Sequence, residues 1–347
     1  MNRIAGFFGS KLQSNSQTAN SNLHIFDFEE IKTATDNFSR EMIISEDKSG
    51  KTYRGVIAGK QVPVMIKILN LDVIQGSEEE WLESLMSLAQ NAQLKHPSLV
   101  KLEGYCCKDE HRVIVYEFLR RGSLGDNLFH VADSETLTWT QRLIVASETA
   151  ECLAFLLRTD KSTIAKTIEC INTSSIFVDN EYKPKLMHFK PLLDGHGLVG
   201  GEPRQLPTVD SLPLDSGAEV HSNVENDAIY RYGIVLLEIL TGSPSTISRT
   251  KSNTGQNLIK WNGRELKYPR DIINAMDEKL EGQYSKSSAR IAGTLAYYCL
   301  RQDLINKRHT IVSVLEVMKL LKESNAALAG ENSTHNEHHG EQKSKKK

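Results

Sequence analysis

The stretch TIAKTIECINTSSIFVDNEYKPKLMHFK, residues 163–190, has the pattern of a β-hairpin. Two short runs of β-branched and apolar residues, Ser175–Val178 and Lys185–Met187, flank a turn at Asn180–Pro184. Apolar runs that are bounded by Asn, Asp and Pro are typical of strands joined by a short connection. We therefore expect a hairpin at this point of the chain.

The segments around this hairpin change in character at about residue 129. Before it, a short amphipathic helix opens near Asp27, and five strand-like runs follow: MII, KTYRGVI, QVPVMIKIL, LVKLEGYCC and HRVIVYEFL. One further helix, SEEEWLESLMSLAQNAQ, interrupts them and carries its apolar residues on one face. After Phe129 helical patterns dominate. The sequence predicts an α+β protein with a five-stranded first lobe containing one helix and a mainly helical second lobe.

The composition excludes several classes of protein. The chain has 347 residues, 39% of them hydrophobic, which is enough for a sizeable core. A net charge of −2 gives no reason to expect nucleic acid as a partner. Five cysteines without a C-x-x-C pair suit a reducing compartment, and no apolar run approaches the ~20 residues that span a bilayer. We expect a cytoplasmic protein with at most peripheral association with the plasma membrane, through its partners.

Both ends of the chain are polar and poor in residues that pack into a core. Residues 1–24 are rich in Ser, Asn and Gln, and residues 326–347 in Asn, His, Glu and Lys. Such compositions favour disorder because little apolar surface can be buried. We expect a flexible leader at 1–24, a folded domain at 25–325 and a disordered tail at 326–347.

A set of ordered motifs connects the folded part to a known family. They are FDFEEIKTATDNFS, TYRGVI, LKHPSLVKLEGYC, VIVYEFLRRGSLGDNLF, LTWTQRL, YRYGIVLLEILTG, NLIKW and MDEKLEGQYS. In this order they resemble the plant receptor-like kinases, above all the receptor-like cytoplasmic kinase branch, over residues 25–325. The resemblance implies a two-lobed protein kinase-like fold with an N-lobe at about 25–117 and a C-lobe at about 118–325.

The resemblance assigns catalytic positions to the opening stretch, and these positions have changed. The family uses H-R-D-x-x-x-x-N for the catalytic base and a magnesium ligand, and D-F-G for a second magnesium ligand. Here Cys170 stands at the base, Ser175 at the Asn and His188 at the D-F-G Asp. A thiol is a poor substitute for a positioned carboxylate, and magnesium prefers oxygen ligands to imidazole. We expect no intact catalytic residue, no metal site and no bound magnesium.

The nucleotide-binding positions are only partly retained. Of the G-x-G-x-x-G pattern that closes over the phosphates, Gly50 alone remains, and Asp47 brings a negative charge to the second Gly position. Lys67 stands where the family lysine holds the phosphates, and Tyr116 begins the hinge between lobes. The resemblance therefore implies a vestigial ATP site, and any ATP binding is expected to be weak.

The acidic partner of the lysine is ambiguous. Alignment on Trp81 gives Glu83 or Ser84, whereas counting back from His96 gives Ser87. Glu83 lies one helical turn from Ser87, so we take it as the candidate partner of the lysine. A solvated acidic face on this helix explains Glu83 equally well.

Two large side chains stand at positions that contact adenine in the family. Met65 replaces a small Ala above the ring, and Phe177 replaces a Leu below it. They are candidates for occluding the adenine slot, although reshaping a working pocket is the open alternative. Ile168 and Phe189 are expected to pack between the lobes in the same way.

Two further positions also indicate a loss of catalytic function. Ala228 replaces the Asp that anchors the catalytic loop, with Asp227 one residue away, and Glu169 reverses the charge of the Arg that receives an activation-loop phosphate. Gly233 and Arg308, which serve the fold, are kept.

These positions together indicate a pseudokinase of the Ser/Thr kinase superfamily. The resemblance implies a signalling adaptor or scaffold that binds an active receptor kinase or another signalling or immune protein. The alternative is a weak or unconventional ATP-dependent Ser/Thr kinase.

Overall fold

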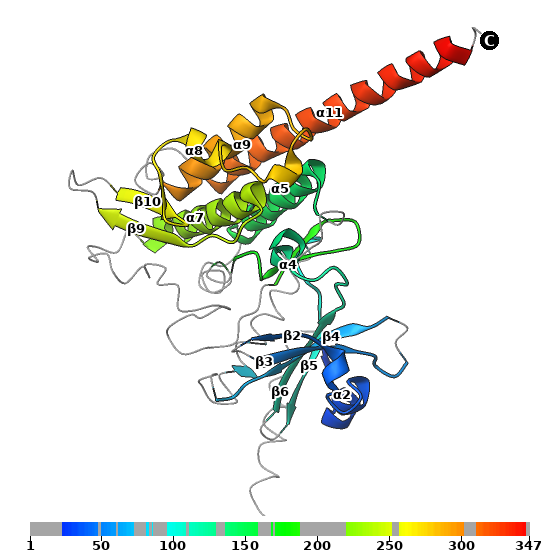
Figure 1. Ribbon diagram of the computed structural model, residues 1–347. Coiled ribbons are helices and arrows are strands. Elements are labelled where there is room, and N and C mark those ends of the chain that lie inside the picture. The colour runs from blue at the N-terminus through cyan, green and yellow to red at the C-terminus, as the bar shows by residue number, and fades with distance from the viewer. Residues whose placement is uncertain are drawn as a thin grey trace, which may run out of the picture. The chain divides into compact units, whose positions relative to one another are not determined.

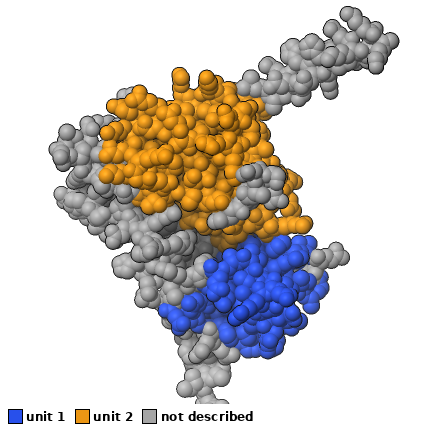
Figure 2. Space-filling view, viewed as in Figure 1, with its two compact units in different colours: residues 1–95, 101–118, 191–195 blue, residues 96–100, 119–190, 196–347 orange. Residues whose placement is uncertain are grey.

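The protein divides into two compact units, shown in Figure 2. The computed structural model describes residues 23–47, 50–59, 62–72, 81, 82, 85, 96–108, 111–129, 136–158, 168, 171–187, 220–251, 257–301 and 310–344. The described residues of unit 1 lie within 23–85 and 101–118, and those of unit 2 within 96–100 and 119–344.

Unit 1 is built on a six-stranded sheet with the order β1-β5-β6-β4-β3-β2. Its strands are β1 (His24–Ile25), β2 (Ile43–Asp47), β3 (Gly50–Gly55), β4 (Val64–Leu69), β5 (Leu102–Lys108) and β6 (His111–Glu117). Neighbouring strands are antiparallel, except that β1 runs parallel to β5. The prediction of five strands is one short because two residues are too few to show an alternating pattern.

Helix α2 (Phe28–Ala34) covers one face of this sheet (Figure 1). It begins where predicted, because the Asp27 carboxylate accepts the Glu29 N–H at 3.2 Å and the Glu30 carboxylate accepts the Asp27 N–H at 2.9 Å. It ends at Ala34, earlier than its apolar spacing suggests, since residues 36–38 have φ between 50° and 58°. The core beneath it comprises Phe26, Ile31, Ala34, Tyr53, Ile57, Val64, Ile66, Cys106, Val113 and Val115.

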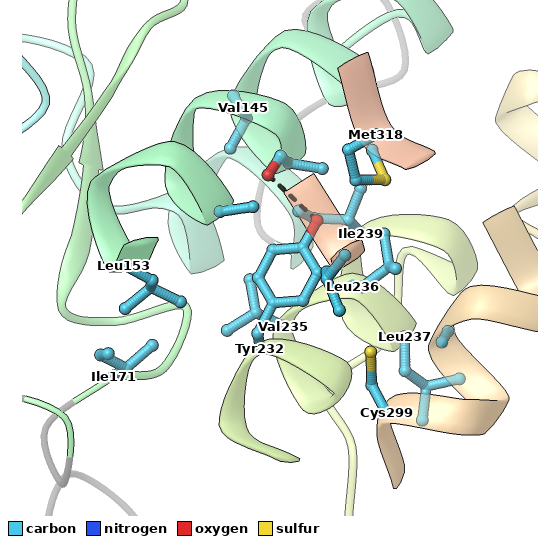
Figure 3. Packing of buried hydrophobic residues seen from close by; sticks show 14 of the residues in the cluster. Val145, Leu153, Ile171, Tyr232, Val235, Leu236, Leu237, Ile239, Cys299 and Met318 are labelled. Carbon is cyan, nitrogen blue, oxygen red and sulfur yellow. Dashed lines mark hydrogen bonds between the residues drawn. The ribbon is translucent and has the colours of Figure 1, made fainter. Parts of the chain in front are cut away.

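Unit 2 is mainly helical, as predicted. Its helices are α4 (Leu124–Phe129), α5 (Trp139–Leu156), α7 (Val220–Thr241), α8 (Pro269–Ile273), α9 (Lys286–Leu300) and α11 (Ile311–Ser344). Helix α7 lies against α5 and α9, and α11 lies against α5 (Figure 1). Where α5 and α7 meet, the buried Tyr232 hydroxyl donates to the Ala146 carbonyl oxygen at 3.0 Å (Figure 3). Burial raises the pKa of Tyr232, so this phenol stays neutral.

A buried ion pair joins helix α5 to the segment that follows α8. The Arg142 guanidinium, on α5, is fully buried and donates to the Asp277 carboxylate at 2.5 Å. It also donates to the carbonyl oxygens of Leu137 at 2.9 Å and Ile239 at 2.6 Å. All three contacts are charge-assisted, which satisfies a cation that would otherwise be costly to bury.

A small sheet in unit 2 was not predicted. Strands β9 (Ile247–Lys251), β10 (Asn257–Trp261) and β11 (Arg264–Leu266) pair antiparallel in the order β11-β10-β9. Asn262 and Gly263, with φ of 46° and 77°, form the two-residue connection between β10 and β11. The Asn-Gly pair is a strong hairpin signal, because both central residues of such a turn need positive φ.

The hairpin predicted from residues 175–187 is confirmed. Strands β7 (Ile176–Val178) and β8 (Pro184–Leu186) pair antiparallel, with Phe177 opposite Lys185. The Asp179 carboxylate closes the turn by accepting the N–H groups of Glu181 at 2.8 Å and Lys183 at 2.9 Å.

The C-terminal segment differs from the prediction of a disordered tail at 326–347. Helix α11 continues through it to Ser344 (Figure 1). The continuation begins with Ala326, Ala327, Leu328 and Ala329. These residues have high helix propensity, and adding a residue to an existing helix is far easier than starting one.

Candidate functional site

The retained nucleotide-site residues of unit 1 share one face of the sheet. Lys67 pairs across strands with Thr52, and Met65 pairs with Tyr116. Directly paired residues lie on the same face, and so do residues two apart on one strand. Gly50, two residues before Thr52, therefore belongs to this face, which is the one opposite the α2 core.

Gly50 has a structural reason to be glycine that involves no phosphate. Its φ is 142°, and a Cβ at this position would lie 1.9 Å from the Ile68 carbonyl oxygen. Any side chain would thus collide with the backbone of β4. The one glycine that remains of the phosphate-binding loop is explained by the packing of strands β3 and β4.

Met65 and Tyr116 are buried, whereas Lys67 is partly exposed. Phe177, the other candidate for occluding the adenine slot, belongs to unit 2 and is partly exposed. The two candidates lie in different units, so their joint occlusion of that slot stays a prediction. Ile168 packs in the core of unit 2 with 1% of its surface exposed.

Several predicted site residues lie outside the described residues. They are Glu83, Glu169, Cys170, His188, Phe189 and Arg308. Their assignments stay predictions. Among the residues that the structure does describe, no group of three or more His, Cys, Asp or Glu side chains is arranged to hold a metal ion.

Ser175 is engaged in closing the loop that precedes β7. Its hydroxyl donates to the Asn172 carbonyl oxygen at 3.0 Å and accepts the Asn172 N–H at 3.1 Å. The Asn172 side-chain oxygen in turn accepts the N–H groups of Ser174 at 2.8 Å and Ser175 at 3.0 Å. The hydroxyl proton and one of its lone pairs are therefore used within the loop.

The same loop is held from α7 by a buried carboxylate that sequence reasoning missed. Glu238, 3% exposed, accepts the Thr173 hydroxyl at 2.8 Å. Its other oxygen accepts the Ser245 N–H at 2.8 Å and the Ser245 hydroxyl at 2.7 Å. The signal was available, because Glu238 is the one charged residue in the apolar run GIVLLEIL, and buried carboxylates are almost always paired.

The position that the resemblance assigns to the family anchor lies within α7 and holds Ala228. Ala228 is fully buried in the core of unit 2 and offers no hydrogen-bonding side chain. Asp227, the neighbouring carboxylate, accepts from the Arg231 guanidinium at 2.7 Å, one turn along the same helix. Within the described part of the loop, Ile171–Ser175, Thr173 is bonded to Glu238 of α7.

The described part of the loop is held in place by several hydrogen bonds. Its polar groups are bonded to the loop backbone and to α7, and Gly125 adds a further bond by donating its N–H to the Thr173 carbonyl oxygen at 2.9 Å. A catalytic base needs a carboxylate or imidazole within reach of the substrate hydroxyl. The described loop residues, Ile171–Ser175, contain neither group.

Comparison with known proteins identifies the family. The chain matches the family described as protein tyrosine and serine/threonine kinase over residues 39–289. It is 36% identical over 309 residues to probable serine/threonine-protein kinase PBL8 of Arabidopsis thaliana, covering 86% of this chain and 72% of the relative. It is 37% identical over 308 residues to EPD1-interacting receptor-like cytoplasmic serine/threonine-protein kinase 5A of Gossypium barbadense, covering 86% of this chain and 64% of that relative.

A solved structure shows the same fold. The pseudokinase domain of BIR2, an immune regulator of the RLK/Pelle family, matches with a TM-score of 0.60 at 20% identity, over 92% of each chain. Among the described residues, no helix is long and apolar enough to cross a membrane. From its matched motifs and its relatives, the chain belongs to the protein kinase family and, within it, to the plant receptor-like cytoplasmic kinases.

Proposed function

We propose that this chain is a catalytically inactive member of its family that acts by binding other proteins. The observation that carries the proposal is the engagement of Ser175 with Asn172 described above. In the family, the residue at this position directs a side-chain oxygen to magnesium. Here the corresponding oxygen serves the fold of its own loop, so the loop keeps its shape without a metal.

Ala228 supports the same proposal independently. A catalytic loop must hold its reacting groups to within a fraction of an ångström, and loss of such positioning costs orders of magnitude in rate. The buried methyl group of Ala228 cannot hold the loop, and Asp227 is paired with Arg231. Changes at Cys170 and His188 remove the base and the second metal ligand as well.

The partner that we propose is an active receptor kinase or another signalling protein. Two relatives from Gossypium barbadense carry names that describe them as EPD1-interacting, which supports a role in binding proteins. Sequence identity of 37% to those relatives does not carry their partner over to this chain. The chain spans 72% of the length of PBL8, 64% of the Gossypium barbadense kinase 5A and 62% of serine/threonine-protein kinase PBL13 of Arabidopsis thaliana.

Affinity capture from plant tissue tests the adaptor function. The full chain and a form lacking residues 191–219, where the family has its activation segment, serve as baits beside empty beads. We expect an active receptor kinase to be enriched on the full chain. A bound set that matches empty beads would contradict the adaptor function.

One observation favours the alternative, a weak kinase. Lys67 is retained on the sheet face that also carries Gly50 and Tyr116. Thermal unfolding with ATP, with and without magnesium, separates the two functions, because ligand at 100 times its Kd adds about 2.7 kcal/mol to stability. We expect no magnesium-dependent shift. A shift that Lys67→Ala abolishes would favour the weak kinase.

A further inference from the structure

The outer face of α9 combines exposed apolar residues with positive charge. Ile291 and Tyr298 are 47% and 38% exposed, and seven residues apart they lie on one side of the helix. Arg290 is exposed about 100° around the helix from Ile291, Lys286 is exposed about 140° from it and lies outside this face, and α9 contains no acidic residue. Among the described residues, neither cation has a recorded ion-pair partner. We call Arg290, Ile291 and Tyr298 the α9 face.

The outer face of α11 has the opposite charge. Val312 and Leu320 are 39% and 66% exposed, and Glu316 and Glu323 are exposed on the same side. The lysines of this part of α11 are engaged elsewhere, since Lys319 binds Glu151 at 2.9 Å and Lys322 lies 3.9 Å from Glu148. Lys319, seven residues from Val312, lies on the same side as that residue, but its charge is offset by Glu151 on α5. We call Val312, Glu316, Leu320 and Glu323 the α11 face.

The two faces fit each other when the helices run antiparallel. At a rise of 1.5 Å per residue, Tyr298 and Ile291 are separated by about 10 Å along α9, and Val312 and Leu320 by about 12 Å along α11. Placing Tyr298 opposite Val312 sets Ile291 opposite Leu320. Arg290 then falls beside Glu323, within about one helical turn.

We propose that these faces form the interface of a homodimer, in which the α9 face of one copy binds the α11 face of the other. Helices α9 and α11 pack beside each other within one chain, so a two-fold axis supplies both pairings at once. Opposite charge favours binding of the α9 face to the α11 face, whereas like charge disfavours binding of two α9 faces or of two α11 faces. A second copy of this chain is therefore the partner that we propose for both faces. The dimer requires no nucleotide and does not depend on whether the chain transfers phosphate.

Sedimentation velocity of the full chain, from about 1 to about 100 µM, measures the association. We expect a monomer–dimer equilibrium that weakens as salt rises, because the charged rim is exposed. Leu320→Glu and Arg290→Glu should each raise the dissociation constant at least tenfold. Combining Arg290→Glu with Glu323→Arg should restore most of the affinity, since the charge pair is re-formed with reversed signs.

Val56→Glu is the matched control, because Val56 is 52% exposed in unit 1 and belongs to neither face. It should leave the dissociation constant unchanged. Circular dichroism melting should show that each variant remains folded. A chain that stays monomeric throughout this range would overturn the proposal. So would a dimer that folded Leu320→Glu and Arg290→Glu variants form as tightly as the native chain.

Discussion

The Ser175 hydroxyl is bonded in both directions to the backbone of Asn172, donating to its carbonyl oxygen at 3.0 Å and accepting from its N–H at 3.1 Å. In the receptor-like cytoplasmic kinase framework, Ser175 stands at the position of a metal ligand. The side chain thus joins two residues of the loop and fixes the turn that leads into β7.

Ser175→Ala should lower the free energy of unfolding of unit 2 by about 1 kcal/mol, because it removes two neutral hydrogen bonds at a partly buried position. Chemical denaturation measures the difference. Ser174→Ala is the control, since Ser174 is exposed and contributes its backbone N–H to this loop. Equal stability of the two variants would show that the hydroxyl does not hold the loop.

Glu238→Ala should destabilise the protein by about 3 kcal/mol, because the Thr173 hydroxyl and the two Ser245 donors would lose a buried charged acceptor. With an unfolding entropy of about 2.1 cal/mol/K per residue, the melting temperature of this 347-residue chain should fall by about 4 °C. The control Glu281→Ala removes an exposed carboxylate and should change the stability by less than about 0.5 kcal/mol. A similar effect of both substitutions would contradict the role given to Glu238.

Much of this architecture follows from the sequence, because it rests on local patterns. The β7–β8 hairpin, the start of α2 at Asp27 and the strand that carries Met65 and Lys67 are all visible as periodicity or turn chemistry. Strand β1 has two residues and pairs with β5, which lies some 80 positions further along the chain. No local sequence pattern predicts such a pairing.

The long-range polar contacts of unit 2 were harder to predict for the same reason. Thr173 and Glu238 are 65 residues apart, and Arg142 and Asp277 are 135 apart. A single sequence shows that a carboxylate stands in an apolar run, but not which donor reaches it. The substitution at Ala228 was predictable from the sequence, whereas the Thr173–Glu238 bond required the fold.

Asp277→Ala should cost about 3–5 kcal/mol, because the fully buried Arg142 would keep its charge without a carboxylate. The control is Asp227→Ala, which removes a partly exposed partner of Arg231 and should cost no more than about 1 kcal/mol. Denaturant midpoints of both variants provide the comparison. An equally small loss of stability in both variants would contradict the importance given to the Arg142–Asp277 pair.

The stability of unit 2 should depend on pH through His96. Burial lowers the pKa of this imidazole, while the carboxylate of Glu151 partly opposes the shift. Its Nδ1 accepts the Ser98 N–H at 3.1 Å, a bond that protonation at Nδ1 would break. The unfolded chain therefore binds a proton near pH 6.5 that the folded chain resists, so stability is lost as pH falls through this value.

Denaturation of the native chain and of His96→Asn, between about pH 5 and pH 8, isolates this contribution. The Asn side-chain oxygen accepts the same N–H but does not titrate in this range. We expect the difference in stability between the two proteins to change with pH in favour of the variant as the solution becomes acidic. A constant difference would exclude His96 as the titrating group.

Phosphotransfer from ATP tests most directly whether this kinase-family chain acts without catalysis. Purified full chain is incubated with radiolabelled ATP, magnesium and a general protein substrate, in parallel with Lys67→Ala. We predict that label incorporated into the chain and into the substrate stays at background and is the same for both proteins. Incorporation by the native chain that Lys67→Ala abolishes would contradict the account.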